Sequence, residues 1–280
     1  MDSTASFAAL AADYARDGVV HVPGVLDAAT LGRVTELFDR GLAEPSGAAA
    51  NLARDDGTTF HQDLGNTRHW EAWADMLRDS PLPRLLADLW GCDDVWFYYE
   101  QVFLKEGGAT RRTPWHQDSS YLPVEGTQIA NLWVPLDPVA AEDALELIPG
   151  SHRGPQYSPS RFDPADETAP IDPEDPRPRL PAIEAARDRF EIVSWACQPG
   201  DVVVFDLGVL HGGAATRPGG RRRTVALRCF GPDARLAAQA GAPSRSSGKV
   251  PRFVRYHREL TPGQPLSDQP AFPRLLARQL

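Results

Sequence analysis

Residues 199–213 read Pro-Gly-Asp-Val-Val-Val-Phe-Asp-Leu-Gly-Val-Leu-His-Gly-Gly. The leading Pro-Gly-Asp is a turn signal, because proline fixes its own φ and glycine accepts backbone conformations that other residues avoid. The β-branched and aromatic run at 202–205 then predicts a buried strand. This segment therefore predicts a strand that starts at a tight turn and leads to His211.

Further strand patterns fill the second half of the chain. Segments rich in β-branched and aromatic residues, separated by Gly, Pro and Asp, are 95–105, 127–136, 145–148, 190–195 and 223–230. Strands that follow one another without long helices between them favour a barrel or a sandwich over a βαβ fold. The sequence therefore predicts a mainly β fold with flanking helices, built on a jelly-roll or cupin-like barrel.

The first ninety residues have a mostly helical pattern. Helices are predicted at 5–15, after Asp27, at 67–78 and at 81–90, with one short strand at 19–22. We expect a single domain over residues 1–280. Its parts are a helical region at about 1–93, a barrel at about 94–231 and a C-terminal extension at 232–280.

Residues 154–181 interrupt the predicted barrel. This stretch contains eight prolines and many acidic residues, and it has no periodic pattern. Long irregular loops inside compact domains are usually functional lids or disordered linkers. Both interpretations stay open at this stage.

Composition excludes several classes of protein. A net charge of -9 and a pI near 5.3 argue against binding of nucleic acid. No apolar run approaches the ~18 residues of a membrane span, and residues 1–10 lack the basic start of a signal peptide. Cys92, Cys197 and Cys229 form no close pair and are interpreted as reduced thiols of a cytoplasmic protein. We expect a small-molecule substrate, while the oligomeric state is not predicted.

One histidine-containing triplet is well placed to bind a metal. In an extended segment residues i and i+2 lie on one side, so His116 and Asp118 can ligate one cation together. His211, at the end of a strand run, is the best third ligand. Two imidazoles and one carboxylate leave coordination positions open, which is typical of Fe(II) oxygenases.

The triplet alone is weak evidence, because His61-Gln62-Asp63 repeats it. We interpret that second copy as part of a polar loop, since short motifs often match by chance. For His116, Asp118 and His211 the alternative is that they are ordinary polar side chains of the surface or the core.

An arginine-rich segment follows His211, and it offers a clamp for a dicarboxylate co-substrate. Its members are Arg217, Arg221, Arg222 and Arg223. A guanidinium group binds a carboxylate through two parallel hydrogen bonds. Most arginines in such a run lie in solvent, so strand parity must select the one that faces inward.

One face of the strand at 223–230 is apolar. Its members are Val225, Leu227 and Cys229. If the apolar face points into the barrel, Arg223 points inward and Arg222 points away. We therefore expect Arg223 to be the clamp.

These residues resemble the phytanoyl-CoA dioxygenase family of Fe(II)/2-oxoglutarate oxygenases. The resemblance covers about residues 95–231 well and the helical front half loosely. It is carried by Trp115-His116-Gln117-Asp118, by 129–137, by 145–152 with its Pro-Gly-Ser-His, by Pro199-Gly200-Asp201 through His211-Gly212, and by Arg223.

The resemblance implies a double-stranded β-helix with iron ligands at His116, Asp118 and His211. It places the 2-oxoglutarate arginine near Arg223 and further co-substrate contacts at Gln101 and Trp133. It also implies the reaction, in which iron, 2-oxoglutarate and molecular oxygen oxidise a substrate and release succinate and carbon dioxide. An aspartate ligand favours hydroxylation or desaturation over halogenation.

Two other functions stay open. One is a cupin-like protein that binds a ligand without oxidising it. The other is a zinc- or manganese-dependent hydrolase or isomerase on the same barrel. Production of succinate from 2-oxoglutarate would distinguish the oxygenase from both.

Overall fold

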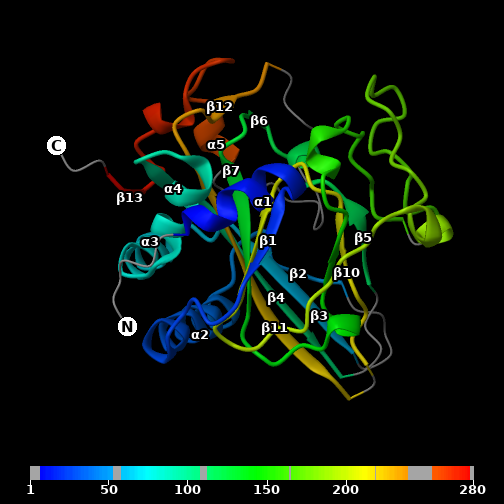
Figure 1. Ribbon diagram of the computed structural model, residues 1–280, viewed down its shortest axis with the longest axis horizontal. Coiled ribbons are helices and arrows are strands. Elements are labelled where there is room, and N and C mark those ends of the chain that lie inside the picture. Colours follow the sequence, from blue (N-terminus) through cyan, green and yellow to red (C-terminus); the bar gives the residue numbers. More distant parts are fainter. Residues whose placement is uncertain are drawn as a thin grey trace.

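Two sheets of unequal size form the framework of the protein (Figure 1). The computed structural model describes residues 7–52, 58–107, 112–163, 165–217, 219–238 and 254–277. In these residues the larger sheet has eight strands in the order β1-β9-β7-β11-β4-β3-β2, with β13 beside β4, and the smaller has the order β5-β10-β8. Their facing arrangement is the expected double-stranded β-helix, or jelly roll, with flanking helices.

The strand bounds follow the predicted strand segments closely in the second half of the chain. The main sheet contains β1 (Val19–Val22), β2 (Ala50–Asn51), β3 (Thr59–Leu64), β4 (Val95–Glu106), β7 (Ile129–Pro135), β9 (Val202–Asp206), β11 (Arg221–Phe230) and β13 (Arg274–Leu276). The small sheet contains β5 (Thr113–His116), β8 (Leu145–Leu147) and β10 (His211–Gly213). A separate ribbon pairs β6 (Val124–Glu125) with β12 (Arg235–Leu236).

Helices cover one side of the main sheet, opposite the small sheet (Figure 1). The α-helices are α1 (Ala11–Asp17), α2 (Ala28–Ala43), α3 (Trp70–Arg78), α4 (Leu82–Trp90) and α5 (Val254–His257). The 3-10 helices are η1 (Ala8–Leu10), η2 (Asp118–Tyr121), η3 (Ala141–Asp143), η4 (Ser151–Arg153), η5 (Glu184–Arg189) and η6 (Leu266–Asp268). Asp27 caps α2 by accepting a hydrogen bond from the Thr30 N–H (2.8 Å), as the sequence predicts.

The main apolar core lies between the helices and the main sheet. Val225, Leu227 and Cys229 of β11 are fully buried there, together with Phe38 of α2 and Leu85 of α4. The alternate residues of β11 face the space between the two sheets. The apolar face of this strand is therefore its outer face, which is covered by helices.

Three features of the fold differ from the predictions. β3 lies in the part expected to be helical, where it pairs with β4, so the polar-loop interpretation of His61-Gln62-Asp63 was wrong. Residues 190–195 form no strand, and Val193 pairs with Leu147 only through an isolated bridge. Because β1 and β3 belong to the main sheet, residue 93 does not separate a helical region from the barrel. Parts of the expected extension at 232–280 fall outside the described residues.

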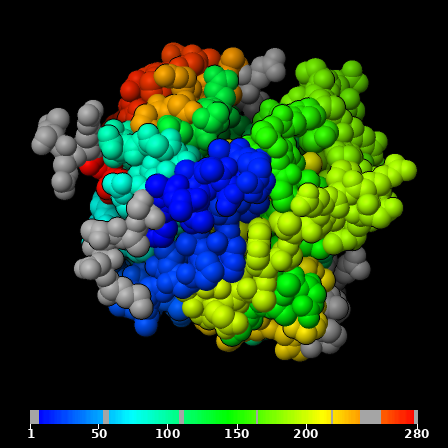
Figure 2. All heavy atoms as spheres, in the orientation of Figure 1, coloured from blue at the N-terminus to red at the C-terminus, as the bar shows by residue number. Residues whose placement is uncertain are grey.

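The described residues of the proline-rich stretch, 154–163 and 165–181, are irregular and lie beside β5 of the small sheet (Figure 1). They project as a lobe from one side of the molecule (Figure 2). Its start is fastened to the barrel, because the Tyr157 N–H donates to the Gln117 side chain (2.9 Å) and the Ser120 hydroxyl donates to the Tyr157 carbonyl (2.7 Å). In the part of the chain that the structure describes, no helix has the length and apolar character needed to cross a membrane.

Glu100 of β4 generates a prediction about stability. Its side chain is buried, accepts a hydrogen bond from the Asn66 N–H (2.6 Å), and burial raises its pKa to about 8. Between the ordinary pKa of a glutamate and pH 8 the unfolded chain therefore loses a proton that the folded chain keeps, so stability falls as the pH rises through this window. Glutamine does not ionise, so Glu100→Gln should avoid this loss of unfolding free energy, which we expect to be on the order of a few kcal/mol in wild type.

The measurement is the free energy of unfolding by urea at pH 5 and at pH 8.5. Wild type should lose more stability than Glu100→Gln between the two conditions. An equal loss in the two proteins would show that Glu100 is ionised in the folded state.

Candidate functional site

The predicted triad comes together between the two sheets. His116 ends β5 and His211 begins β10, and the two residues are direct cross-strand partners. Gln117 is extended, so Asp118, at the start of η2, returns to the same side as His116. Asp118 Oδ1 lies 3.5 Å from His116 Nε2 and 3.9 Å from His211 Nε2. The three ligand atoms all lie within 4.8 Å of one another, which a single cation can span.

Backbone carbonyls fix the orientation of both imidazoles. His116 Nδ1 lies 2.9 Å from the Pro114 carbonyl oxygen, and His211 Nδ1 lies 2.9 Å from that of Val209. A carbonyl only accepts, so each Nδ1 carries the proton and donates it. Nε2 is then the atom of each ring that is left to ligate a metal, and both Nε2 atoms face Asp118 Oδ1.

The second oxygen of Asp118 is held by a buried cation. Arg228 donates to Asp118 Oδ2 from Nη2 (2.7 Å) and Nε (3.1 Å), and Asn131 donates to the same oxygen (3.1 Å). Arg228 also stacks over the Tyr99 ring at 4.7 Å. These contacts occupy Oδ2 and leave Oδ1 directed at the two histidines.

Electrostatics set the protonation states of the triad. Burial works against the charge of Asp118, but Arg228 and then the two histidines outweigh it and hold the pKa of Asp118 well below its usual range. Burial, reinforced by His116, lowers the pKa of His211 to about 3. At neutral pH the site therefore presents a carboxylate and a neutral His211, as cation binding requires.

These donors fit Fe(II). Two imidazole nitrogens and one carboxylate oxygen on one side of an ion leave its remaining positions to other ligands. The site also contains no thiolate, which would favour other metals.

A cavity of about 660 Å³ surrounds the triad between the two sheets. Its aromatic lining residues are Phe60, Tyr99, Phe103, Tyr121, Trp133, Phe162 and Phe205. Gln101 also lines it, so both residues that the family resemblance selected, Gln101 and Trp133, face the cavity. Such a volume holds a drug-sized molecule.

The prediction that Arg223 points into the barrel was wrong. Arg223 forms an ion pair with Asp137 (2.9 Å) at the rim and does not line the cavity. Arg222 is buried and lines the cavity instead, as do Thr224, Ala226 and Arg228 of the same strand. The parity argument failed because the apolar face of β11 packs against the helices and not into the barrel interior.

Arg222 shares its end of the cavity with Lys105. The two residues are cross-strand partners, and both donate to the Ala214 carbonyl oxygen, Arg222 at 3.1 Å and Lys105 at 3.5 Å. Arg222 donates its other hydrogen bond to the Asp143 carbonyl, and burial lowers its pKa to about 10. The printed hydrogen bonds of the buried Arg222 guanidinium go to backbone carbonyls, so this cation favours an anionic ligand at its end of the cavity.

The spacing of this cationic end from the triad suits a diacid. Arg222 Nη2 lies 3.6 Å from the position a Cβ of Gly213 would occupy. Gly213 follows His211 by two strand residues, or about 7 Å. A five-carbon dicarboxylate can bridge such a distance.

The irregular lobe reaches the triad through Phe162. The ring of Phe162 stacks on Tyr121 (centroids 5.5 Å apart) and meets His116 edge-on (5.2 Å). Phe162 is the non-glycine residue in the described part of the chain with a positive φ, at 56°. Such a backbone conformation is unfavourable for a bulky residue and is kept where its surroundings require it.

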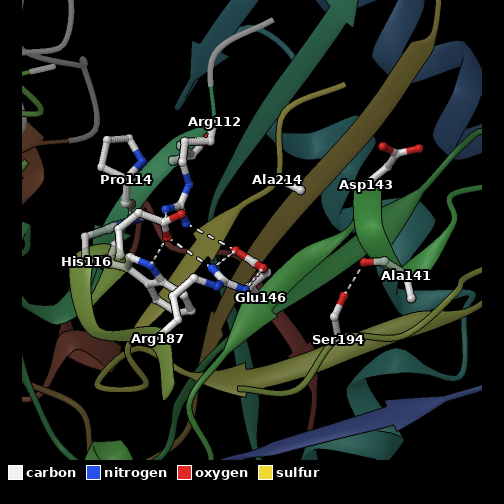
Figure 3. Close-up of polar contacts among 12 residues, drawn as sticks. Arg112, Pro114, His116, Ala141, Asp143, Glu146, Arg187, Ser194 and Ala214 are labelled. Carbon is white, nitrogen blue, oxygen red and sulfur yellow. Dashed lines mark hydrogen bonds and ion pairs between the residues drawn. The ribbon is translucent and has the colours of Figure 1, made fainter. Parts of the chain in front are cut away.

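Charged residues fasten the loop after this lobe to the small sheet. Arg112, before β5, and Arg187, on η5, both point toward Glu146 of β8 (Figure 3), at 3.2 Å and 2.5 Å. The Trp115 indole donates to Glu184 of η5 (3.1 Å). This network supports the strand that presents His116.

The competing triplet forms no such centre. Asp63 accepts hydrogen bonds from the N–H groups of Ser46 (2.7 Å) and Leu64 (2.9 Å). Among the described residues, neither His61 nor Asp63 belongs to a group of converging metal-binding atoms.

Arg228, Asn131 and Lys105 were not predicted. The alternation along β11, β7 and β4 shows which residues share a face with each of them, but their roles depend on partners far away in the sequence. Arg228, for example, lies 110 residues from Asp118.

Sequence comparison places the chain among known oxygenases. The phytanoyl-CoA dioxygenase (PhyH) family matches residues 14–224, which include the triad and Arg222 but stop before Arg228. None of the curated proteins matches the sequence.

Several solved structures share the fold. The α-ketoglutarate-dependent epimerase SnoN from nogalamycin biosynthesis, in complex with Fe3+, α-ketoglutarate and nogalamycin RO, is 23% identical with a TM-score of 0.70 over 96% of this chain and 98% of that chain. The carbocyclase SnoK of the same biosynthesis is 19% identical with a TM-score of 0.69, over 95% of each chain. EctD from S. alaskensis is 18% identical with a TM-score of 0.63, over 87% of this chain and 85% of that chain. At these identities the likeness establishes the fold.

The two triplets give a matched test of the metal site. We expect His116→Ala and His211→Ala each to lose most Fe(II) affinity, because each removes one of three converging ligands, and backbone carbonyls already orient both imidazoles. His61→Ala should bind Fe(II) like wild type. Anaerobic titration calorimetry with Fe(II) measures all three affinities, and loss of binding in His61→Ala alone would contradict the assignment.

Proposed function

This chain belongs to the phytanoyl-CoA dioxygenase family, and we propose that it hydroxylates a small-molecule substrate with Fe(II), 2-oxoglutarate and molecular oxygen. The observation that carries the proposal is the convergence of His116 Nε2, His211 Nε2 and Asp118 Oδ1 inside a cavity whose other end holds Arg222. When bound, iron and 2-oxoglutarate supply the oxidant that removes a substrate hydrogen, while succinate and carbon dioxide are released.

Two sets of residues would position the iron and the co-substrate. His116, Asp118 and His211 hold the metal, and Arg228 and Asn131 keep Asp118 turned so that one oxygen faces it. Arg222 binds the distal carboxylate of 2-oxoglutarate, with Lys105 beside it, because both are buried cations at the far end of the cavity. Gln101 and Trp133 complete the walls of the co-substrate pocket.

The rest of the cavity would hold the substrate. Its aromatic and apolar wall fits a natural product or another molecule of similar size, placed with one C–H bond near the triad. We propose that residues 154–181 act as a lid of a single catalytic domain, since Phe162 projects from them to within contact of His116. The described cysteines are free thiols, consistent with the cytoplasmic location that we propose.

The mass of the product decides which oxidation occurs. The protein should be incubated with Fe(II), 2-oxoglutarate, oxygen and a metabolite extract, and both succinate and new products should be measured. A product with one added oxygen atom supports hydroxylation. An unchanged mass would indicate epimerisation. A loss of two hydrogens would indicate desaturation or ring closure. A product formed without succinate would point to a hydrolase or isomerase.

Substitutions of Arg222 and of its neighbour Arg223 test which arginine binds the distal carboxylate of 2-oxoglutarate. Removing one partner of a buried charge pair costs roughly 3–5 kcal/mol. This corresponds to a loss on the order of a hundred- to a thousandfold in affinity. Arg222→Ala should therefore raise the 2-oxoglutarate concentration needed for half-maximal succinate formation by this factor, and Arg222→Lys should restore it only in part.

Arg223→Ala is the matched control. Its guanidinium pairs with Asp137 at the rim, so the 2-oxoglutarate requirement should not change. Iron binding by both variants confirms that each is folded. If Arg223→Ala raised the 2-oxoglutarate requirement and Arg222→Ala did not, Arg223 would be the residue that binds the distal carboxylate, and the proposed role of Arg222 would be refuted.

The lid is tested by two substitutions of Phe162. Phe162→Ala and Phe162→Gly both remove the ring beside His116, but glycine also relieves the positive φ. If the ring shapes the substrate site, both variants should oxidise the substrate about tenfold or more slowly while keeping wild-type 2-oxoglutarate affinity. Wild-type substrate turnover by Phe162→Gly, measured as product formed per minute, would show that the ring has no such role.

A further inference from the structure

A second group of metal-binding side chains lies at the edge of the main sheet. His21 is on the edge strand β1, and Cys197 and Asp201 flank the turn that begins β9. Because β1 pairs with β9, this turn lies beside His21 although 176 residues separate His21 from Cys197. The group shares no residue with the triad in the cavity.

The three side chains converge on one point. His21 Nε2 lies 3.8 Å from Cys197 Sγ and 3.4 Å from Asp201 Oδ2, and all three atoms lie within 4.8 Å of one another. Ligand atoms about 2.0–2.3 Å from a tetrahedral zinc ion have mutual spacings of this size.

This geometry does not suit a nucleophilic triad. In such a triad the thiol contacts one imidazole nitrogen and the carboxylate holds the other. Here the thiol and the carboxylate both approach Nε2. They therefore surround a shared point and do not form a relay through the ring.

The surrounding structure holds two of the three side chains in place. Asp201 accepts hydrogen bonds from the N–H groups of Gly24 and Gln198 (2.8 Å each), one on each oxygen, so each oxygen keeps a lone pair. The His21 ring stacks on Trp195 with centroids 5.8 Å apart. Cys197 and Asp201 are buried, whereas the His21 side chain is 17% exposed, which leaves a route for an ion and a water ligand.

We propose that His21, Cys197 and Asp201 form a second metal site that binds Zn²⁺ with a water molecule as the fourth ligand. One sulfur, one nitrogen and one oxygen are all ligands that zinc accepts in tetrahedral sites. The ion would tie the edge strand β1 to the turn before β9, so its role is structural and independent of the iron centre.

Binding would displace a proton. Burial, aided by Asp201, raises the pKa of the Cys197 thiol to about 11, and the thiol donates to the Trp195 carbonyl (3.4 Å). Zinc binds the thiolate, so the thiol proton leaves when the ion enters.

Cobalt(II) is the probe that separates this site from the triad, because a thiolate ligand gives a sulfur-to-cobalt charge-transfer absorption in the near ultraviolet. Titration of the full chain with Co²⁺ under reducing conditions should produce this absorption and saturate it once both centres are filled, and Zn²⁺ should abolish it. His116→Ala and Cys229→Ser should keep the absorption, because the first lies in the other centre and the second is a remote buried thiol.

Cys197→Ser and His21→Ala should each lose the absorption while circular dichroism shows that both stay folded. No absorption in wild type with cobalt in large excess would overturn the proposal. So would an absorption that persists in Cys197→Ser. Either result leaves the iron centre unaffected, since that centre contains no thiol.

Discussion

The buried negative charge of Asp118 is the feature on which the rest of the site depends. A carboxylate inside a protein is costly unless cations and hydrogen-bond donors surround it, and this one has Arg228 and Asn131 on one oxygen. Removing such a partner typically costs about 3–5 kcal/mol, because the remaining charge stays buried. The arrangement keeps Asp118 ionised and turns its other oxygen toward the two histidines, so the site is organised before any ion arrives.

Each of the two sheets supplies a different part of this site. The small sheet supplies both histidines on adjacent strands, so their separation is fixed by cross-strand pairing. The main sheet supplies Arg222 and Arg228 from one face of β11, so the two cations are held at fixed places along a single strand. Helices α2, α3 and α4 pack on the opposite face of the main sheet, which leaves the space between the sheets open for ligands.

The sequence predicts the residues whose roles depend on local pattern. His116 and Asp118 are two positions apart, and His211 follows a clear strand, so their convergence needed only the barrel fold. The prediction that Arg223 faces the barrel interior was wrong because alternation shows that two faces differ but not which one meets the cavity. β3 was missed because its Thr-Phe-His-Gln-Asp-Leu sequence is too polar to stand out as a strand. The contact of Arg228 with Asp118 and that of Phe162 with His116 depend on the folded chain and have no local signal.

We propose that one ion at the triad is chelated by a 2-oxo acid that reaches Arg222. Anaerobic addition of 2-oxoglutarate to the Fe(II)-loaded protein tests it most directly, because chelation of Fe(II) by a 2-oxo acid gives a visible metal-to-ligand charge-transfer absorption. The account predicts that this absorption appears and saturates in wild type and in Arg223→Ala, and that it is absent in His211→Ala. Saturating Fe(II) and 2-oxoglutarate without any such absorption in wild type would contradict it.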